Sequence, residues 1–279
     1  MSEDRADRPG PVIVTGGSSG IGLAITTRLA RRGHPVALVA RRPALLAGAA
    51  ATITAAVPGA VVSTHTLDVA DAAVLARAAD AVVAVHGPVA WLIASAGIVE
   101  PGLFADLPIE SHRRQMETNH FGTLAAVHAV LPSMRVAGRG RIVMVSSGAG
   151  LFGIWGYSAY APTKFAVRGL AEVLRLELGE MGITVTLALP PDTDTPQLTG
   201  ERASRPAATE AIAGGGGVWS AEAVAEVILR AADRGRFLAT PGLGLTLLAR
   251  VHGLIGPLLR RHQLRIVRRL VRPPRDGDT

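Results

Sequence analysis

The stretch VIVTGGSSGIG at residues 12–22 decides the fold. Its apolar start predicts a buried strand, and its glycine-rich turn leads directly into a segment of helical composition. Glycines let backbone N–H groups approach a pyrophosphate, and a helix start offers unpaired N–H donors and a positive dipole end. An ordinary glycine-rich turn is the alternative, but the position in the first strand–turn–helix unit favours a dinucleotide. The predicted cofactor contacts of this turn are Gly16, Ser18, Ser19, Gly20, Ile21 and Gly22.

Short apolar runs alternate with longer segments rich in alanine and leucine over the first two thirds of the chain. The runs predicted as strands are Val12–Thr15, Val36–Ala40, Val61–Leu67, Trp91–Ala94, Arg141–Ser146 and Thr184–Leu189. The segments predicted as helices are Ile21–Arg32, Ala44–Ala56, Ala72–His86, Ile109–Ala137, Thr163–Glu180 and Ala221–Arg234. This order predicts an α/β fold, a Rossmann-type doubly wound parallel sheet of about seven strands with helices on both faces. Because the runs are almost wholly apolar, we expect strands buried on both sides.

The end of the second predicted strand bears on the choice of cofactor. Arg41 and Arg42 follow Ala40, where an acidic residue would bind the ribose hydroxyls of NAD and repel a 2′-phosphate. Guanidinium groups make bidentate bonds to phosphate, so the pair favours NADP(H); two solvated surface charges are the alternative. Asp68 ends the third strand, where it reaches the adenine edge. Capping of the next helix is a strong alternative for Asp71 and a weaker one for Asp68.

The segment Tyr160-Ala161-Pro162-Thr163-Lys164 carries the candidate chemistry. A spacing of four puts Tyr160 and Lys164 on one helical face, where an ammonium would lower the tyrosine pKa from about 10 toward the neutral range. Ser147 ends the fifth strand, where its hydroxyl can hydrogen-bond a substrate carbonyl, and Asn119 can hold a water that links Lys164 to solvent. The predicted catalytic residues are therefore Asn119, Ser147, Tyr160 and Lys164.

Composition supports this set, because Lys164 is the sole lysine and Asn119 the sole asparagine of 279 residues. An apolar content of 48% and a charged content of 18% predict a sizeable core rather than disorder. The absence of cysteine excludes disulfides, thiolate metal sites and a catalytic thiol, and we predict no metal site. A polar N-terminus without an apolar core favours a cytoplasmic protein.

The positive charge is concentrated near the C-terminus. Residues 237–275 contain no Asp or Glu but eight arginines, more than the whole formal net charge of +7. Leu247, Val251, Leu254 and Leu258 recur at helical spacing, which predicts an amphipathic basic helix on an anionic membrane surface at the cytoplasmic face. A helix packed on the domain or on a partner subunit is the alternative. Nucleic-acid binding is disfavoured because no reading motif or aromatic platform is present.

The predicted organisation has three parts. Residues 1–10 form a polar N-terminal segment, 11–240 an NADP-binding catalytic domain, and 241–279 the basic amphipathic tail. Within the catalytic domain, the proline- and glycine-rich residues 190–219 read as a long mobile loop that would act as a substrate lid.

These motifs together resemble the short-chain dehydrogenase/reductase family over about residues 12–198. The shared features are the TGxxxGxG turn, the Asn119 helix, Ser147 thirteen residues before the tyrosine, and YxxxK. The resemblance implies that Ser147 polarises a carbonyl, Tyr160 donates a proton, and Lys164 also binds the nicotinamide ribose. It further implies a homodimer or homotetramer and cofactor contacts by Asp68, Val69, Ala96, Gly97, Tyr160, Lys164, Pro190 and Thr195.

Two stretches depart from the family pattern, and neither removes a reacting group. Ala94-Ser95-Ala96-Gly97 replaces the usual NNAG, which alters support around the cofactor, and Pro190-Pro191 replaces the usual PG. Pro162 inside YxxxK is tolerable only in the first turn of a helix.

Within the family the chain is most similar to 3-ketodihydrosphingosine reductases, above all in PPDTDTP at 190–196. That similarity implies NADPH-dependent reduction of a long-chain lipid ketone. The alternatives are another apolar ketone or alcohol, such as a steroid, retinoid or 3-oxoacyl compound, or a non-catalytic cofactor-sensing scaffold at the membrane surface. Leu151, Phe152, Ile154 and Trp155 follow Ser147 and form either an apolar substrate wall or ordinary core, and Tyr157 reads as a packing residue.

Overall fold

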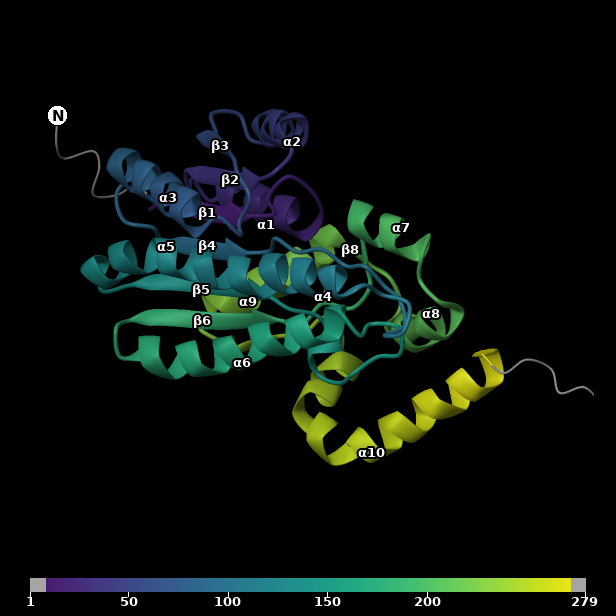
Figure 1. The fold of residues 1–279 in the computed structure, drawn as a ribbon. Helices are drawn as coiled ribbons and strands as arrows, with labels where there is room; N and C mark the ends of the chain where they lie inside the picture. The colour runs from purple at the N-terminus through teal and green to yellow at the C-terminus, as the bar shows by residue number, and fades with distance from the viewer. Residues whose placement is uncertain (1–8, 272–279) are drawn as a thin grey trace, which may run out of the picture.

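The computed structural model describes residues 9–271 and has a seven-stranded, wholly parallel sheet at its centre (Figure 1). The strand order is β3-β2-β1-β4-β5-β6-β9. Its members are β1 (Val12–Thr15), β2 (Val36–Ala40), β3 (Val62–Thr66), β4 (Trp91–Ala94), β5 (Gly140–Val145), β6 (Ile183–Ala188) and β9 (Leu238–Ala239). The predicted Rossmann-type fold is confirmed. The order reverses between β1 and β4, and ligands of such sheets bind at that switch point, beyond the carboxyl ends of the strands.

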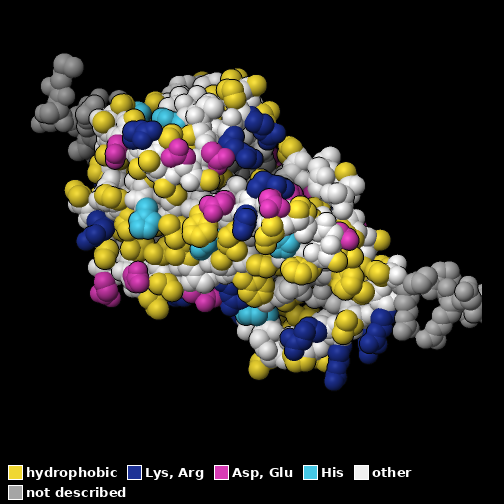
Figure 2. Space-filling model, viewed as in Figure 1, with side chains coloured by type: hydrophobic (Ala, Val, Ile, Leu, Met, Phe, Trp, Pro, Cys, Tyr) yellow, Lys and Arg dark blue, Asp and Glu magenta, His cyan; other side chains and the backbone are white. Residues whose placement is uncertain are grey.

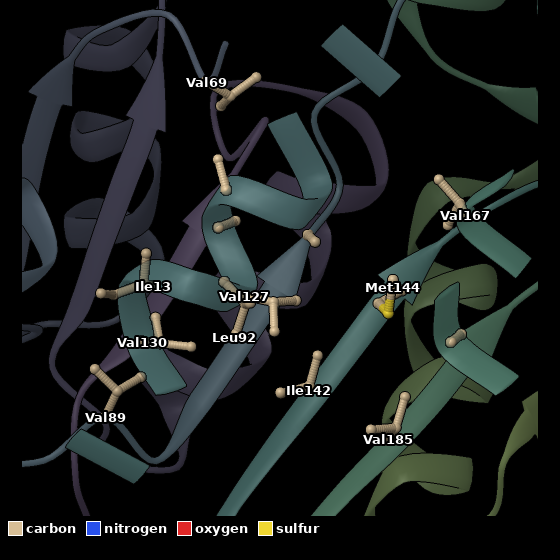
Figure 3. Close-up of a cluster of buried hydrophobic side chains, with 14 of the residues drawn as sticks. Ile13, Val69, Val89, Leu92, Val127, Val130, Ile142, Met144, Val167 and Val185 are labelled. Atoms are coloured by element: carbon tan, nitrogen blue, oxygen red, sulfur yellow. The ribbon is translucent and has the colours of Figure 1, made fainter. Parts of the chain in front are cut away.

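Helices cover both faces of the sheet. On one face lie α1 (Gly20–Arg31), α2 (Pro43–Ala56) and α9 (Ala221–Asp233), and on the other α3 (Ala72–His86), α4 (Ile109–Met116), α5 (Gly122–Ala137) and α6 (Tyr160–Gly179). Alternate strand residues supply the two cores, as the period of two requires. In Figure 3, Ile13 and Leu92 of the strands lie beside Val127 and Val130 of α5.

The expectation that every strand is buried on both sides is wrong for β3. This strand forms an edge of the sheet, and its residues, VSTHT, are half-buried or exposed. An edge strand with polar side chains resists pairing with a second chain, which explains why a run in this position tolerates serine, threonine and histidine.

The helix predicted over Ile109–Ala137 is interrupted where Asn119 lies. A π-helical turn, Glu117–Phe121, separates α4 from α5. The extra residue in such a turn changes the direction of the side chains within it, and these turns are frequent at functional sites. The turn therefore points Asn119, which is fully buried, toward the loop after β4 and toward α6.

The segment 190–219, predicted as a long mobile loop, contains regular elements instead. This segment holds strand β7 (Thr193–Asp194), helix α7 (Pro196–Arg202), helix α8 (Ala207–Ala213) and a 3-10 turn, Gly214–Gly216. Strand β8 (Trp219–Ser220) then pairs in parallel with β7. The hydroxyl of Thr195 caps α7 by accepting from the Leu198 N–H at 3.2 Å. The role of this segment as a lid stays a prediction.

The C-terminal part of the described chain is one long helix, α10 (Leu243–Val271), which changes direction along its length (Figure 1). Pro257 lies inside it, and a proline within a helix favours such a bend. Ala249 and Val267 are buried against the domain, while Leu247, Leu254 and Leu258 are exposed. Within residues 9–271, none of the helices is both long and apolar enough to cross a membrane. Arg272 and Arg275 of the predicted tail, and residues 1–8, lie outside the described residues.

Candidate active site

A cleft of about 550 Å³ runs along the carboxyl ends of the strands. It collects side chains and backbone from the turns after β1, β2, β4, β5 and β6, which are far apart in sequence. Of the predicted cofactor-binding residues, the cleft is lined by Gly16, Ser18, Ser19, Gly20, Ile21, Arg41, Arg42, Asp68, Val69, Ala96, Gly97, Lys164, Pro190 and Thr195. Gly22 and Tyr160 are buried and are not among the residues that line the cleft.

The turn after β1 fits a pyrophosphate. Gly16 has a left-handed φ of +71°, and a Cβ on it would meet the Ser95 backbone at 2.8 Å. A Cβ on Gly22 would collide with the Gly16 carbonyl, so both positions require glycine for close packing. The Ser19 side chain does not cap α1, and the first N–H groups of this twelve-residue helix therefore remain free to bind an anion. This cradle suits the diphosphate of a nicotinamide dinucleotide.

Arg41 and Asp68 face each other at the far end of the cleft, 3.8 Å apart between Arg41 Nη1 and Asp68 Oδ2. Both side chains are about half exposed, so their ion pair leaves the guanidinium accessible to a ligand. Asp68 also accepts from the Ala70 N–H at 3.1 Å. The capping alternative is confirmed for Asp71, whose carboxylate accepts from the Val74 N–H at the start of α3.

Tyr160 and Lys164 lie on consecutive turns at the start of α6. Tyr160 is the first residue of the helix, and Pro162 lies within its first turn, where a missing N–H is tolerated. The Lys164 Nζ lies 5.6 Å from the centre of the Tyr160 ring and donates to the Val145 carbonyl at 3.1 Å. Strand β5 therefore holds the ammonium over the phenol ring, as the spacing of four predicts.

Ser147 connects the buried phenol to the cleft. It follows β5, lines the cleft, and accepts from the Ala149 N–H at 3.1 Å. Its hydroxyl also lies near enough to the phenol of Tyr160 to favour the ionised form of that phenol. Only 9% of Tyr160 is exposed, and Ser147 and Lys164, which flank its phenol, both line the cleft.

Asn119 joins the loop after β4 to the start of α6. Its Nδ2 donates to the Ile98 carbonyl at 2.9 Å and to the Thr163 hydroxyl at 3.0 Å, and its Oδ1 accepts from the Ile98 N–H at 2.8 Å. With both amide hydrogens bonded, Asn119 has only acceptor capacity left for a water. Its water-holding role stays a prediction, whereas its bonds fix the position of Thr163, next to Lys164.

Burial has opposite effects on the charges of the two central groups. It lowers the pKa of Lys164 to about 8, which leaves the amine largely protonated at neutral pH. Burial, and then the charge of Glu201, raise the pKa of Tyr160 above its usual value, and the Ser147 hydrogen bond opposes this only in part. The expectation of a depressed phenol pKa is therefore wrong for the protein alone, because burial disfavours the charged phenolate and Glu201 adds a charge of the same sign.

Sequence reasoning missed a buried ionic cluster beside Tyr160. Arg205 donates to Asp192, Glu201 and Glu210, each at 2.7 Å, and its side chain is only 1% exposed. The Tyr157 hydroxyl donates to Glu201, and its ring lies edge-on to Tyr160 with 5.2 Å between centroids. Glu201 and Arg205 are four residues apart, a spacing that allows an ion pair within helical segments. The pair could have been predicted from this spacing if the segment had not been interpreted as a loop.

The four apolar candidates after Ser147 separate into different environments. Leu151 and Phe152 pack with the core between the sheet and α6, whereas Ile154 packs with the small cluster that contains Tyr160. The Trp155 N–H donates to Gln263 of α10 at 3.3 Å, and the Gln263 amide donates to the Gly153 carbonyl at 2.9 Å. Helix α10 is therefore tied to the loop that follows Ser147.

A sequence profile described as short chain dehydrogenase matches residues 11–206, and the chain belongs to this family of oxidoreductases. A 3-dehydrosphinganine reductase of Danio rerio is 37% identical over 238 residues, which cover 83% of this chain and 70% of that protein. A 3-ketodihydrosphingosine reductase of Bos taurus is 37% identical over 234 residues, with the same coverage.

Solved structures agree with the fold. Levodione reductase superposes with a TM-score of 0.75 at 26% identity, over 83% of this chain and 94% of that one. A short chain dehydrogenase from Mycobacterium paratuberculosis bound to NAD superposes with a TM-score of 0.74 at 24% identity, over 84% and 95% of the two chains, which shows likeness of fold alone.

The lowered pKa of Lys164 predicts a pH dependence of stability. Between about pH 8 and the ordinary lysine value of 10.5, the unfolded chain holds a proton that the folded protein has lost. Stability therefore rises with pH in this window, by at most about 1.4 kcal/mol per pH unit, and the burial penalty is fully present below it. Urea unfolding of the wild type and Lys164→Met, measured from about pH 7 to about pH 9.5, should give curves that diverge with pH. Parallel curves would show that the amine keeps its ordinary pKa.

Proposed function

We propose that this protein is an NADPH-dependent reductase of a long-chain lipid ketone, most closely 3-ketodihydrosphingosine, which it converts to dihydrosphingosine. The observation that carries the proposal is that Ser147 and Lys164, which line the glycine-rich cleft, lie next to the phenol of Tyr160. The names of the relatives from Danio rerio and Bos taurus support the choice of substrate. A non-catalytic scaffold would have no need for this set of groups.

The reaction uses three side chains of this protein. The hydroxyls of Ser147 and Tyr160 hold the oxygen of the ketone, and the phenol gives its proton to that oxygen as negative charge develops there. When bound, the nicotinamide dinucleotide supplies the hydride. Lys164 places a positive charge beside the phenol, which favours the phenolate left after the proton has moved.

The protonation state of Tyr160 fits the role of a general acid in ketone reduction. A general acid must carry its proton before the reaction step, and a phenol is protonated at neutral pH even before burial raises its pKa further. The same burial makes it a weak acid, so positive charge brought in by a ligand is needed to make proton transfer favourable.

Replacement of Tyr160 by Phe keeps the ring that packs against Tyr157 and removes only the proton donor. We expect ketone reduction to fall by a factor of about 100 or more, because a positioned general acid contributes that much. NADPH affinity, measured by fluorescence titration, should stay within a few-fold of the wild type. Tyr157→Phe is the matched control: it removes a hydroxyl that bonds Glu201 rather than the proton donor, and turnover should fall far less than in Tyr160→Phe. Full activity of Tyr160→Phe would refute its role as the acid.

The preference for NADPH rests on Arg41 and Arg42 in the adenosine end of the cleft. Replacement of Arg41 by Ala should weaken NADPH binding about 10- to 100-fold, since it removes charge-assisted bonds to the 2′-phosphate. NADH binding should change little. Titration of wild type, Arg41→Ala and Arg42→Ala with both cofactors tests this, and equal losses for NADPH and NADH would refute the phosphate contact.

We also propose that the outward face of α10 binds an anionic membrane surface, where a long-chain substrate resides. Leu254 is 85% exposed, and Arg250, Arg260, Arg261, Arg265, Arg268 and Arg269 are all exposed. None of these six arginines forms an ion pair with a residue in 9–271. Figure 2 shows blue and yellow side chains together on the lower right, where α10 lies in Figure 1. The homodimer or homotetramer stays a prediction.

Vesicle sedimentation tests the membrane proposal. The protein should bind vesicles containing phosphatidylglycerol more tightly than neutral phosphatidylcholine vesicles, and added salt should weaken this binding. The double replacement Leu254→Ser with Leu258→Ser should reduce the bound fraction several-fold because it removes the inserted apolar surface. Leu176→Ser is the control, since this leucine is 77% exposed on α6. Equal binding to both kinds of vesicle would contradict the proposal.

A further inference from the structure

We infer that Glu201 binds the ammonium group of the substrate, so that the site selects ketones with an amine on the neighbouring carbon. This inference rests on the proposed function and narrows it to sphingoid bases. It assigns a specificity-determining role to a residue of α7, outside the Ser147, Tyr160 and Lys164 set.

Glu201 is close to the reacting group. It lines the same cleft as Ser147 and Lys164, although its side chain is only 8% exposed. Its negative charge reaches Tyr160 strongly enough to raise the pKa of that phenol. The Tyr157 hydroxyl donates to Glu201, and the Tyr157 ring lies edge-on to Tyr160 with 5.2 Å between centroids, so a cation bound to Glu201 would lie on the Tyr160 side of the cleft.

One oxygen of the Glu201 carboxylate is saturated and the other is free. Oε1 accepts from the Tyr157 hydroxyl and from Arg205 Nε at 2.9 Å and Nη2 at 2.7 Å. No residue within the described range donates to Oε2. This oxygen is also not sealed off, because in residues 9–271 the buried, unpartnered side-chain atoms belong to His112 and His120. The cleft thus leaves a carboxylate oxygen ready to accept a hydrogen bond from a ligand.

The charges around Glu201 do not cancel. Arg205 pairs with Asp192, Glu201 and Glu210, and the second cation of the cluster, Arg202, pairs among residues 9–271 only with Glu210, at 3.5 Å. Three carboxylates with two guanidiniums leave one excess negative charge in this part of the structure. A partly buried carboxylate with an incomplete counter-charge is stabilised by a cationic ligand.

A sphingoid ketone has the matching chemistry. Its amine is on the carbon adjacent to the ketone, and the protonated amine therefore lies beside the carbonyl oxygen that Ser147 and Tyr160 hold. Steroids, retinoids and 3-oxoacyl compounds lack this cation. The bound ammonium would also offset the Glu201 charge that keeps the phenol a weak acid, so the correct substrate would favour proton transfer as well as binding.

The test compares a short-chain 3-keto sphingoid base with the 3-ketone of equal length that lacks the amine, at mildly acidic pH. The wild type should prefer the amine in kcat/KM by about 10- to 100-fold, the range of a hydrogen-bonded ion pair. Glu201→Gln should lose most of this preference, because kcat/KM should fall for the ketone with the amine and stay the same for the ketone without it. NADPH affinity should not change. Glu210→Gln, which also contacts Arg205 but does not line the cleft, should keep the preference.

A second measurement uses the wild type alone and therefore does not depend on whether Glu201→Gln folds. The alcohol product that carries the amine should inhibit the wild type more strongly than the alcohol that lacks it. The ammonium site would be overturned by any of three results: equal inhibition by the two alcohols, an unchanged substrate preference in Glu201→Gln, or a loss of NADPH affinity in Glu201→Gln in place of the loss of preference. Reduction of both ketones with equal efficiency would leave the lipid reductase standing without ammonium recognition. Failure to reduce either ketone would instead refute the proposed function.

Discussion

The chemistry of this site depends on the almost complete burial of an amine beside a phenol. Lys164 is held by the last carbonyl of β5 and lies over the ring of Tyr160 at the start of α6. Burial lowers the pKa of the amine and raises that of the phenol, so each group is pushed toward its neutral form. The phenol therefore carries its proton in the ligand-free protein, as a general acid must before the chemical step.

The rest of the fold positions this pair. The sheet brings Gly16 and Ser147 to one cleft from strands that are far apart in sequence. The π-helical turn aims Asn119 at Thr163, which fixes the first turn of α6. On the opposite side, Arg205 ties α7 to the segment after β6 and holds Glu201 near the phenol. Helix α10 contacts the loop after Ser147 through Gln263, which links the surface proposed for membrane contact with the substrate side of the site.

The sequence was most informative where the physical constraint is local. The glycine turn at 16–22, the spacing from Tyr160 to Lys164 and the cap at Asp71 all depend on residues within a few positions of one another. The π-helical turn at Asn119 and the helices between residues 190 and 219 depend on contacts with distant segments, and proline and glycine content gave no sign of them. The raised pKa of Tyr160 was missed for the same reason, since burial and the charge of Glu201 arise only in the folded protein.

The most direct measurement is the ionisation of Tyr160 itself, which this chain permits because it has only two tyrosines. In Tyr157→Phe, the tyrosinate absorbance reports Tyr160 alone. The account predicts that the ligand-free protein shows no tyrosinate until the pH exceeds the ordinary tyrosine value of about 10. A phenol that ionises near neutral pH without cofactor or substrate would contradict the claim that burial, rather than the neighbouring ammonium, decides its state.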